Sequence, residues 1–235
     1  MALAGHATDT AGAKAVELYT YARSVAAHRV RIALNYKLIT YTSRYVDVTG
    51  EDLQDYRFRR LNPQGLAPVL VDDGHVISQS MAILEYLEER VPVRPLLPPD
   101  PWGRARVRSL AQLFVADVQP LHNRRVLRFL RDRVGVDDGK LDRWFKHWVM
   151  QGLEAAEYLL SGPETGSYCH GEQPTLADAC LVPEVHRALA RGYDLSAFPR
   201  VRSVYHTCTT LAAFQAAAPE TQADVDGWPE RSPSR

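Results

Sequence analysis

The chain has 235 residues, of which 46% are hydrophobic and 24% are charged, a composition typical of a soluble globular protein. Its 28 basic residues balance its 28 acidic ones, so charge gives no support to nucleic-acid binding or to docking on an anionic membrane. No segment approaches the roughly 18 uninterrupted apolar residues of a transmembrane helix. We therefore expect no nucleic-acid partner and no membrane partner.

The first 14 residues are rich in Ala, Gly and Thr without periodicity, so we expect a disordered leader over 1–14. They lack the basic start and apolar core of a secretion signal. The cysteines Cys169, Cys180 and Cys208 are odd in number and are not spaced as CxxC. This pattern suits a reducing compartment, and we expect a cytoplasmic protein with buried, unpaired thiols.

Residues 15–91 alternate between short β-prone runs and helical patterns. The predicted elements, in order, are a strand over 16–21, a helix from residue 26, a strand over 41–48, a short helix over 52–62, a hairpin over 68–77 that turns at Asp73-Gly74, and a helix over 79–91. Because a helix separates the first two strands, we expect them to be parallel. The order βαβαββα predicts a thioredoxin-like domain in which helices cover a mixed sheet.

Prolines crowd residues 92–101, where neither a helix nor a central strand tolerates them, and we place a linker and the domain boundary there. Residues 102–218 show helical periodicity and predict an all-α domain. Its apolar stripes are Val107, Leu110, Phe114, Val118 and Leu121, then Leu141, Phe145, Trp148, Gly152, Ala156 and Leu159. Thr175 and Asp178 have the spacing of a capping box. The polar tail over 219–235 is expected to be mobile.

Ser24 stands where the first strand turns into the first helix. The unpaired N–H groups and the dipole of a helix start attract an anion, and a hydroxyl there can help to hold a phosphate, a carboxylate or a thiolate. Ser24 also fits a plain N-cap, and the segment alone favours that interpretation. The apolar residues of this helix are Val30, Ala33 and Leu34, with Arg29 and Arg31 on its other sides.

Two further features of the first domain point to the same kind of ligand. A cis Pro68 would turn the backbone N–H and C=O of Ala67 outward, ready to pair with an extended peptide. Gln79 and Ser80 open another helix, where their donors suit a carboxylate. Together with Ser24, these features describe a pocket for a small acidic peptide with a thiol. Metal-ligand spacing, a glycine-rich phosphate loop and a GxSxG elbow are not found in the sequence.

Several segments of the chain match motifs of a known family. They are Tyr21-Ala22-Arg23-Ser24, residues 28–34, residues 61–68, residues 79–89, Pro120-Leu121-His122-Asn123-Arg124-Arg125 and residues 174–183. In combination, over about residues 17–219, they resemble the zeta-class glutathione transferases, which include maleylacetoacetate isomerase and bacterial maleylpyruvate isomerase. The resemblance implies the glutathione transferase fold and a homodimer.

The resemblance also implies roles for residues. Glutathione would lie on the first domain, with Ala67, before Pro68, pairing with its cysteinyl backbone and with Gln79 and Ser80 holding its γ-glutamyl end. Ser24 and Arg23 would be catalytic. Asn123, Arg124 and Arg125 would bind substrate in a hydrophobic and basic site between the domains.

The chain departs from the family beside Ser24, where Val25 and Ala26 replace polar groups. Near Leu189-Ala190, where the isomerases carry arginines, Arg187 and Arg191 are displaced. The leading hypothesis is a glutathione-dependent cis–trans isomerase of a maleyl-type α,β-unsaturated keto acid. A specialised isomerase or transferase acting on a longer conjugated substrate, with or without glutathione, stays open. So does a non-catalytic ligand-binding protein of the same fold.

Overall fold

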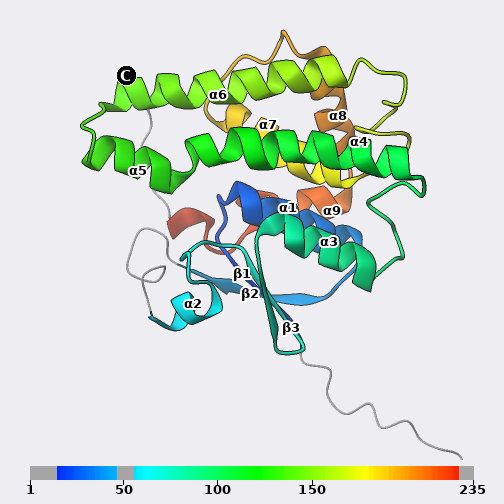
Figure 1. Ribbon diagram of the computed structural model, residues 1–235, viewed down its shortest axis with the longest axis horizontal. Coiled ribbons are helices and arrows are strands. Elements are labelled where there is room, and N and C mark those ends of the chain that lie inside the picture. The colour runs from blue at the N-terminus through cyan, green and yellow to red at the C-terminus, as the bar shows by residue number, and fades with distance from the viewer. Residues whose placement is uncertain (1–14, 47–55, 228–235) are drawn as a thin grey trace, which may run out of the picture.

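A four-stranded mixed sheet forms the centre of the first part of the chain, with helices packed against it (Figure 1). The computed structural model of the protein describes residues 15–46 and 56–227. The predicted leader, the end of the predicted second strand, the start of the predicted second helix and the last residues of the tail lie outside these ranges.

The strands are β1 (Val16–Thr20), β2 (Tyr41–Tyr45), β3 (Val69–Asp72) and β4 (His75–Ser78), in the order β2-β1-β3-β4 across the sheet. β1 is parallel to β2, as predicted from the helix between them, and antiparallel to β3. β3 and β4 form the predicted hairpin. Asp73 and Gly74 at its turn have φ angles of 48° and 80°, the left-handed conformation that a tight hairpin turn requires.

Helices cover both faces of the sheet, which confirms the thioredoxin-like arrangement. α1 (Val25–Tyr36) and α3 (Ser80–Arg90) lie on the face toward the second part of the chain, and α2 (Tyr56–Leu61) lies on the other face (Figure 1). Phe58 of α2 packs against Val46 and Val69 in a small core of its own. The main core lies on the opposite face, where Leu18 and Leu70 join the apolar residues of the helices.

Helices dominate the second part of the chain, as the periodicity predicts. They are α4 (Pro101–Gln112), the π-helix η2 (Leu113–Val118), the 3₁₀-helix η3 (Gln119–His122), α5 (Arg124–Asp132), α6 (Asp138–Leu159), α7 (Leu176–Ala190), α8 (Pro199–Thr209) and α9 (Ala212–Gln215). The predicted apolar stripes are largely buried. Leu159 is an exception at 42% exposure, because it is the last residue of α6.

α1 lies between the sheet and the helical domain, and α7 packs on it. Residues 27–34 of α1 are therefore all buried. Arg29 and Arg31, which the spacing sets apart from the apolar residues of this helix, are completely buried as well. A helix packed on both sides has no solvated face on which to place them.

The helix that begins at Pro101 changes geometry before it ends. Its α-helical part stops at Gln112 and continues as η2 and η3. Pro120 has no N–H to donate and its ring clashes with the preceding turn, so a regular α-helix cannot pass through it. Gly152 of α6 faces the widened part, and a Cβ there would lie only 2.3 Å from Val118 Cγ2. This close approach explains a glycine inside α6.

The predicted capping box begins α7. Asp178 Oδ2 accepts hydrogen bonds from the Thr175 N–H at 2.8 Å and from the Thr175 hydroxyl at 2.7 Å. Asp178 Oδ1 accepts a third from the Cys169 N–H. Cys169, Cys180 and Cys208 are buried and unpaired, as expected.

Residues 219–227, which the sequence assigns to a mobile tail, pack against the molecule in the structure. They include the 3₁₀-turns η4 (Pro219–Thr221) and η5 (Val225–Gly227), and Gln222 between them is buried. The remainder of the tail lies outside the described residues.

A buried ion pair ties the proline-rich linker to the first domain. Lys37 Nζ lies 2.7 Å from Glu88 Oε2 and also donates to the carbonyl of Val91 at 2.7 Å. The Glu88 carboxylate accepts from the N–H groups of Leu96 and Leu97 at 3.0 and 3.3 Å. The linker is thus held by charges from α1 and α3. A domain boundary within 92–101 stays a prediction.

We predict that Glu88→Ala destabilises the fold by about 3–5 kcal/mol, because it leaves the Lys37 ammonium buried without its counter-ion. Urea unfolding measures this loss. The neighbouring Glu89 is exposed, so Glu89→Ala is the matched control and should change the stability by no more than about 0.5 kcal/mol. Equal losses in the two variants would contradict the role assigned to Glu88.

Candidate functional site

Ser24 is the N-cap of α1, and its hydroxyl oxygen accepts a hydrogen bond from the Ala27 N–H at 3.1 Å. The capping interpretation is therefore confirmed. A serine hydroxyl that accepts through one lone pair still has its own hydrogen to donate. The cap thus fixes the position of Ser24 and leaves its O–H free for an anion at the helix start.

Val25 and Ala26 follow Ser24 in the first turn of α1. Val25 is buried in the protein interior and Ala26 is half-buried. Neither side chain has a polar atom, so Ser24 is the one hydroxyl that residues 24–26 offer. The dipole of α1 and the N–H groups of its first turn supply the remaining attraction for an anion.

The second predicted helix start, at Gln79 and Ser80, is connected to α1 through Arg29. Arg29 Nη1 donates to Ser80 Oγ at 3.2 Å, and both groups are buried. Because Ser80 Oγ accepts this bond, its hydrogen is available to a carboxylate. Gln79 is exposed, has a φ of 71°, and donates from its amide to Gln64 Oε1 at 2.7 Å. The structure thus links α1, which Ser24 caps, to Ser80 of α3.

The peptide bond between Ala67 and Pro68 is cis. Strand β3 begins at the next residue, Val69, which pairs with Tyr19 on one side and Ser78 on the other. Within residues 15–46 and 56–227, the backbone N–H and C=O of Ala67 form no hydrogen bond with another described residue. Both groups therefore suit pairing with an extended peptide.

The predicted substrate-binding residues differ in exposure. Arg23, between Ala22 and Ser24, is half-buried. Asn123 is the N-cap of α5 and accepts from the Arg125 N–H at 3.1 Å. Arg124 is half-buried, whereas Arg125 is exposed.

A buried polar cluster that the sequence interpretation missed lies between α1 and the helical domain. Its members are Arg29, Gln119, His122 and Glu184. Arg29 Nη2 donates to Gln119 Oε1 at 3.4 Å, and His122 Nε2 lies 3.1 Å from Glu184 Oε2 with both side chains 1% exposed. Burial opposes the ionisation of Glu184, but His122 and Arg29 outweigh it and hold the pKa of Glu184 below its ordinary value. A glutamate after Pro183 inside an apolar helix is the sequence signal for a buried, paired charge.

The displaced arginines, Arg187 in α7 and Arg191 just after its end, lie over an aromatic ring. The guanidinium of Arg187 is 5.2 Å from the ring centre of Phe145, and that of Arg191 is 4.0 Å away. Burial lowers the pKa of Arg187, while the charge of Glu184 opposes that shift. Arg191 also pairs with Asp142 at 2.9 Å. Arg187 thus adds a positive charge to the polar cluster.

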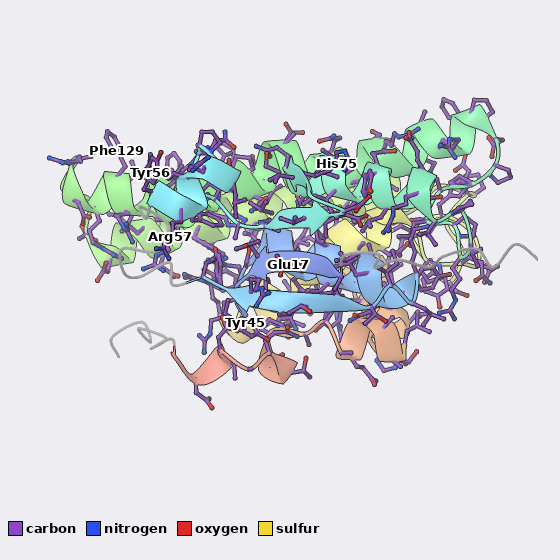
Figure 2. All side chains as sticks on the ribbon, turned by 90° about the horizontal axis from the view of Figure 1, so that it is seen from below. Glu17, Tyr45, Tyr56, Arg57, His75 and Phe129 are labelled. Carbon is purple, nitrogen blue, oxygen red and sulfur yellow. The ribbon has the colours of Figure 1, made fainter. Side chains whose placement is uncertain are left out.

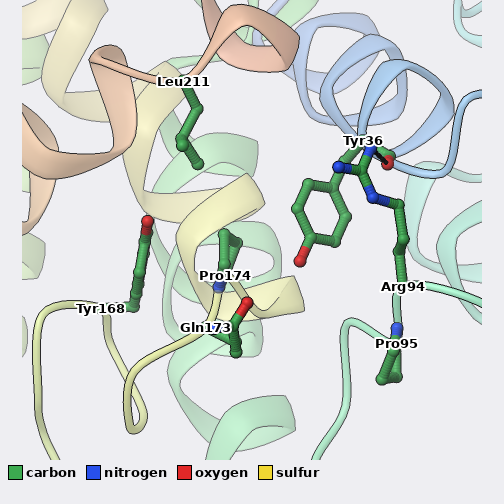
Figure 3. Close-up of a pocket in the computed structure, with 7 residues that line it drawn as sticks. All are labelled: Tyr36, Arg94, Pro95, Tyr168, Gln173, Pro174 and Leu211. Atoms are coloured by element: carbon green, nitrogen blue, oxygen red, sulfur yellow. Dashed lines mark hydrogen bonds between the residues drawn. The ribbon is translucent and has the colours of Figure 1, made fainter.

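A hollow of about 330 Å³ lies at the other end of α1, lined by Tyr36, Arg94, Pro95, Tyr168, Gln173, Pro174 and Leu211 (Figure 3). With about 1.5 Å of rise per residue, α1 separates Tyr36 from Ser24 by roughly 18 Å. The hollow is thus distinct from the start of α1, where Ser24 lies. Among the described residues, we find no His, Cys, Asp and Glu cluster suited to a metal ion. In the same part of the chain, every helix is too short or too polar to cross a bilayer.

Known proteins resemble this chain over most of its length. Residues 23–90 match the family model of the glutathione S-transferase N-terminal domain. The chain is 42% identical to a maleylpyruvate isomerase of Ralstonia sp over 89% of its own length and 99% of that protein. It is 43% identical to the maleylacetoacetate isomerase of Pseudomonas aeruginosa over 89% and 99% of the two chains.

A solved maleylpyruvate isomerase, described as a bacterial zeta-class glutathione S-transferase, superposes with a TM-score of 0.86 at 42% identity, covering 88% of this chain and 99% of its own. The chain belongs to the zeta class of glutathione S-transferases. A Methylobacterium maleylacetoacetate isomerase with bound malonate and glutathione gives 0.87 at 38% identity, over 91% and 100%. Class membership confirms the predicted fold.

His28 of this zeta-class chain is a buried histidine close to the Ser24 turn. Its ring meets that of His186 edge-on at 5.8 Å, and its Nε2 has no hydrogen-bond partner within the described ranges. Burial, and then the charges of Arg31, His186 and Arg29, lower the pKa of His28 well below 6.5. His28 is therefore neutral in the folded protein.

This shift predicts a loss of stability in acid. Below pH 6.5 the unfolded chain binds a proton at His28, whereas His28 in the folded chain stays neutral. The contribution of this group to the free energy of unfolding is therefore fully present above pH 6.5 and is lost as the pH falls below it. The contribution of His28 is about 1.4 kcal/mol per pH unit. Urea unfolding from about pH 7.5 to about pH 5.5 should show a shallower decline for His28→Gln than for the exposed control His206→Gln. Parallel declines would contradict the shift.

Proposed function

We propose that this protein is a glutathione-dependent cis–trans isomerase of a maleyl-type α,β-unsaturated keto acid, such as maleylpyruvate or maleylacetoacetate. The observation that carries the proposal is the hydroxyl of Ser24, held by the Ala27 N–H at the start of α1 in a chain 42% identical to a maleylpyruvate isomerase over nearly all of that protein. Ser80, held by Arg29, supplies a second anion site on the same domain.

The residues present fit glutathione. The N–H and C=O of Ala67, the residue before Pro68, would hold its cysteinyl backbone. The Ser80 hydroxyl, which already accepts a hydrogen bond from Arg29, would donate to its γ-glutamyl carboxylate. Gln79 adds an amide at the same helix start. Ser24 then lies at the remaining anion site, where the thiol is expected.

Glutathione, when bound, supplies a thiolate that adds reversibly to the cis double bond and so permits rotation about it. Ser24 stabilises the sulfur anion by donating its O–H, and the first turn of α1 adds its N–H groups and dipole. Val25 and Ala26 have no polar side-chain atoms. Within residues 24–26, only the Ser24 hydroxyl can therefore stabilise the sulfur anion through a side chain. The backbone geometry of the turn therefore decides how much thiolate forms at neutral pH.

The substrate's carboxylates require cations near Ser24. We assign them to Arg23 beside the thiol site and to Arg124 and Arg125 at the start of α5, behind the cap Asn123. A guanidinium binds a carboxylate through two parallel hydrogen bonds and also stabilises negative charge that develops on a neighbouring oxygen. These assignments follow the motif that the chain shares with the zeta class.

The assembly and location are part of the same proposal. We propose a homodimer in which the first domain of one subunit packs against the second domain of the other. We also propose that the protein works in the cytoplasm, since its three buried thiols are unpaired and a reducing compartment keeps glutathione in its thiol form.

The test follows the ultraviolet band of maleylpyruvate with purified protein, with and without glutathione. Ser24→Ala should lower kcat about a hundredfold, the effect of removing one donor that stabilises a developing anion. It also removes a helix cap, at a cost of about 1 kcal/mol of stability. Ser203→Ala, at an exposed position of α8, is the control.

Each arm of this assay can refute one part of the proposal. An unchanged band at high enzyme concentration would exclude this substrate and favour a longer conjugated acid or a binding protein. An unchanged rate without glutathione would exclude the cofactor. Full activity of Ser24→Ala would show that the hydroxyl at this turn has no catalytic role.

A further inference from the structure

The turn that presents Arg23 and Ser24 is held from behind by Arg31. Arg31 Nη2 donates to the Ala22 carbonyl at 2.9 Å, and Nη1 donates to the Tyr21 carbonyl at 3.3 Å and the Thr20 hydroxyl at 2.9 Å. The Arg31 guanidinium is completely buried. Burial lowers the pKa of Arg31 only to about 10, so it stays cationic at neutral pH. The Tyr21 and Ala22 carbonyls of the turn thus stabilise the buried positive charge of Arg31.

The C-terminal segment supplies the groups that complete this arrangement. Asp224 Oδ2 accepts from the Ala22 N–H at 3.0 Å, 202 residues away in the chain. Arg31 Nε donates to the Ala217 carbonyl at 2.9 Å. The Ala223 N–H donates to the Tyr45 hydroxyl at 3.3 Å, and Figure 2 shows Tyr45 on the side of β2 toward the C-terminal segment. We call residues 217–224 the strap.

The backbone of Ala22 is hydrogen-bonded to the strap on one side and to Arg31 on the other. Its N–H is bound by Asp224 and its C=O by Arg31, and the residue itself is completely buried. Ser24 follows two residues later, and its N–H donates to the Tyr21 carbonyl at 3.2 Å. The peptide groups that set the position of the Ser24 hydroxyl are therefore fixed by contacts from the far end of the chain.

We propose that Asp224 and Arg31 are positioning residues for the thiol site: the strap locks the turn at Ala22 and thereby sets where the Ser24 hydroxyl and the α1 N–H groups point. The proposal rests on the proposed function. An error of about 1 Å in the position of a catalytic donor is enough to cost a large part of the rate. Within residues 24–26 the Ser24 hydroxyl is the one side-chain donor, so its placement matters more.

The test compares Asp224→Ala, Asp224→Asn and the control Asp226→Ala, an exposed acid in the same segment. Amide hydrogen exchange of a peptide spanning residues 19–27 reports on the turn without any ligand. Asp224→Ala should exchange faster at Ala22 and Ser24. In the isomerase assay its kcat should fall about tenfold, the loss expected for one hydrogen bond to a charged group. The ultraviolet thiolate absorption of bound glutathione should fall with it.

Asp224→Asn keeps an oxygen acceptor for the Ala22 N–H, so it should retain kcat within about threefold of the wild type. Asp226→Ala should match the wild type in every measurement. If Asp224→Ala does not fold, Tyr45→Phe removes the hydroxyl that accepts from Ala223 and should give smaller changes of the same kind. Large changes in exchange and kcat for Asp224→Ala, with small ones for Asp224→Asn and none for Asp226→Ala, support a positioning role. A general loss of stability is not expected to give this order.

The proposal is overturned if Asp224→Ala lowers the melting temperature but leaves exchange at 19–27, kcat and the thiolate absorption unchanged. It is also overturned if Asp224→Asn is as impaired as Asp224→Ala. A wild-type protein without isomerase activity or glutathione binding would refute the proposed function instead. In that case, hydrogen exchange would still decide whether the strap fixes the turn.

Discussion

Two arginine side chains of α1 have no access to water, and their burial decides what the elements around them must supply. Arg29 and Arg31 are both completely buried. A guanidinium out of water needs partners for its N–H groups, because each unpaired donor costs free energy. Ser80 and Gln119 accept from Nη1 and Nη2 of Arg29, whose Nε has no partner among the described residues. Arg31 donates to three backbone carbonyls and the Thr20 hydroxyl. These partners come from the sheet, α3, the helical domain and the C-terminal segment.

α1 is consequently in contact with both the sheet and the helical domain. Ser24 lies at its start, Arg29 at its middle reaches Ser80, and Lys37 after its end holds the linker through Glu88. A displacement of α1 would shift both proposed glutathione anchors together. The fold therefore fixes the distance between the proposed thiol site and the proposed γ-glutamyl site, because Ser24 caps α1 and Ser80 of α3 accepts a hydrogen bond from Arg29 of α1.

Local patterns predicted much of the fold, because local physics determines those parts. The capping box at Thr175 and Asp178, the Asp73-Gly74 hairpin and the Ser24 cap involve neighbours in sequence. The contact between Ala22 and Asp224 spans 202 residues and ends in a polar tail that composition assigns to disorder. Periodicity set Arg29 and Arg31 apart from the apolar residues of α1 but did not predict their burial, since it describes one apolar face and α1 is packed on two.

The departure at Val25 and Ala26 gains a physical explanation from these long-range contacts. Val25 is buried, so a polar side chain at that position would need a partner inside the core. The buried Val25 side chain contributes packing at this position but offers no hydrogen-bond donor to the proposed anion site. With Ser24 as the remaining hydroxyl of residues 24–26, the proposed thiol site would depend on the accuracy of the turn rather than on the number of donors. A turn bound at its N–H by Asp224 and at its carbonyls by Arg31 is suited to that demand.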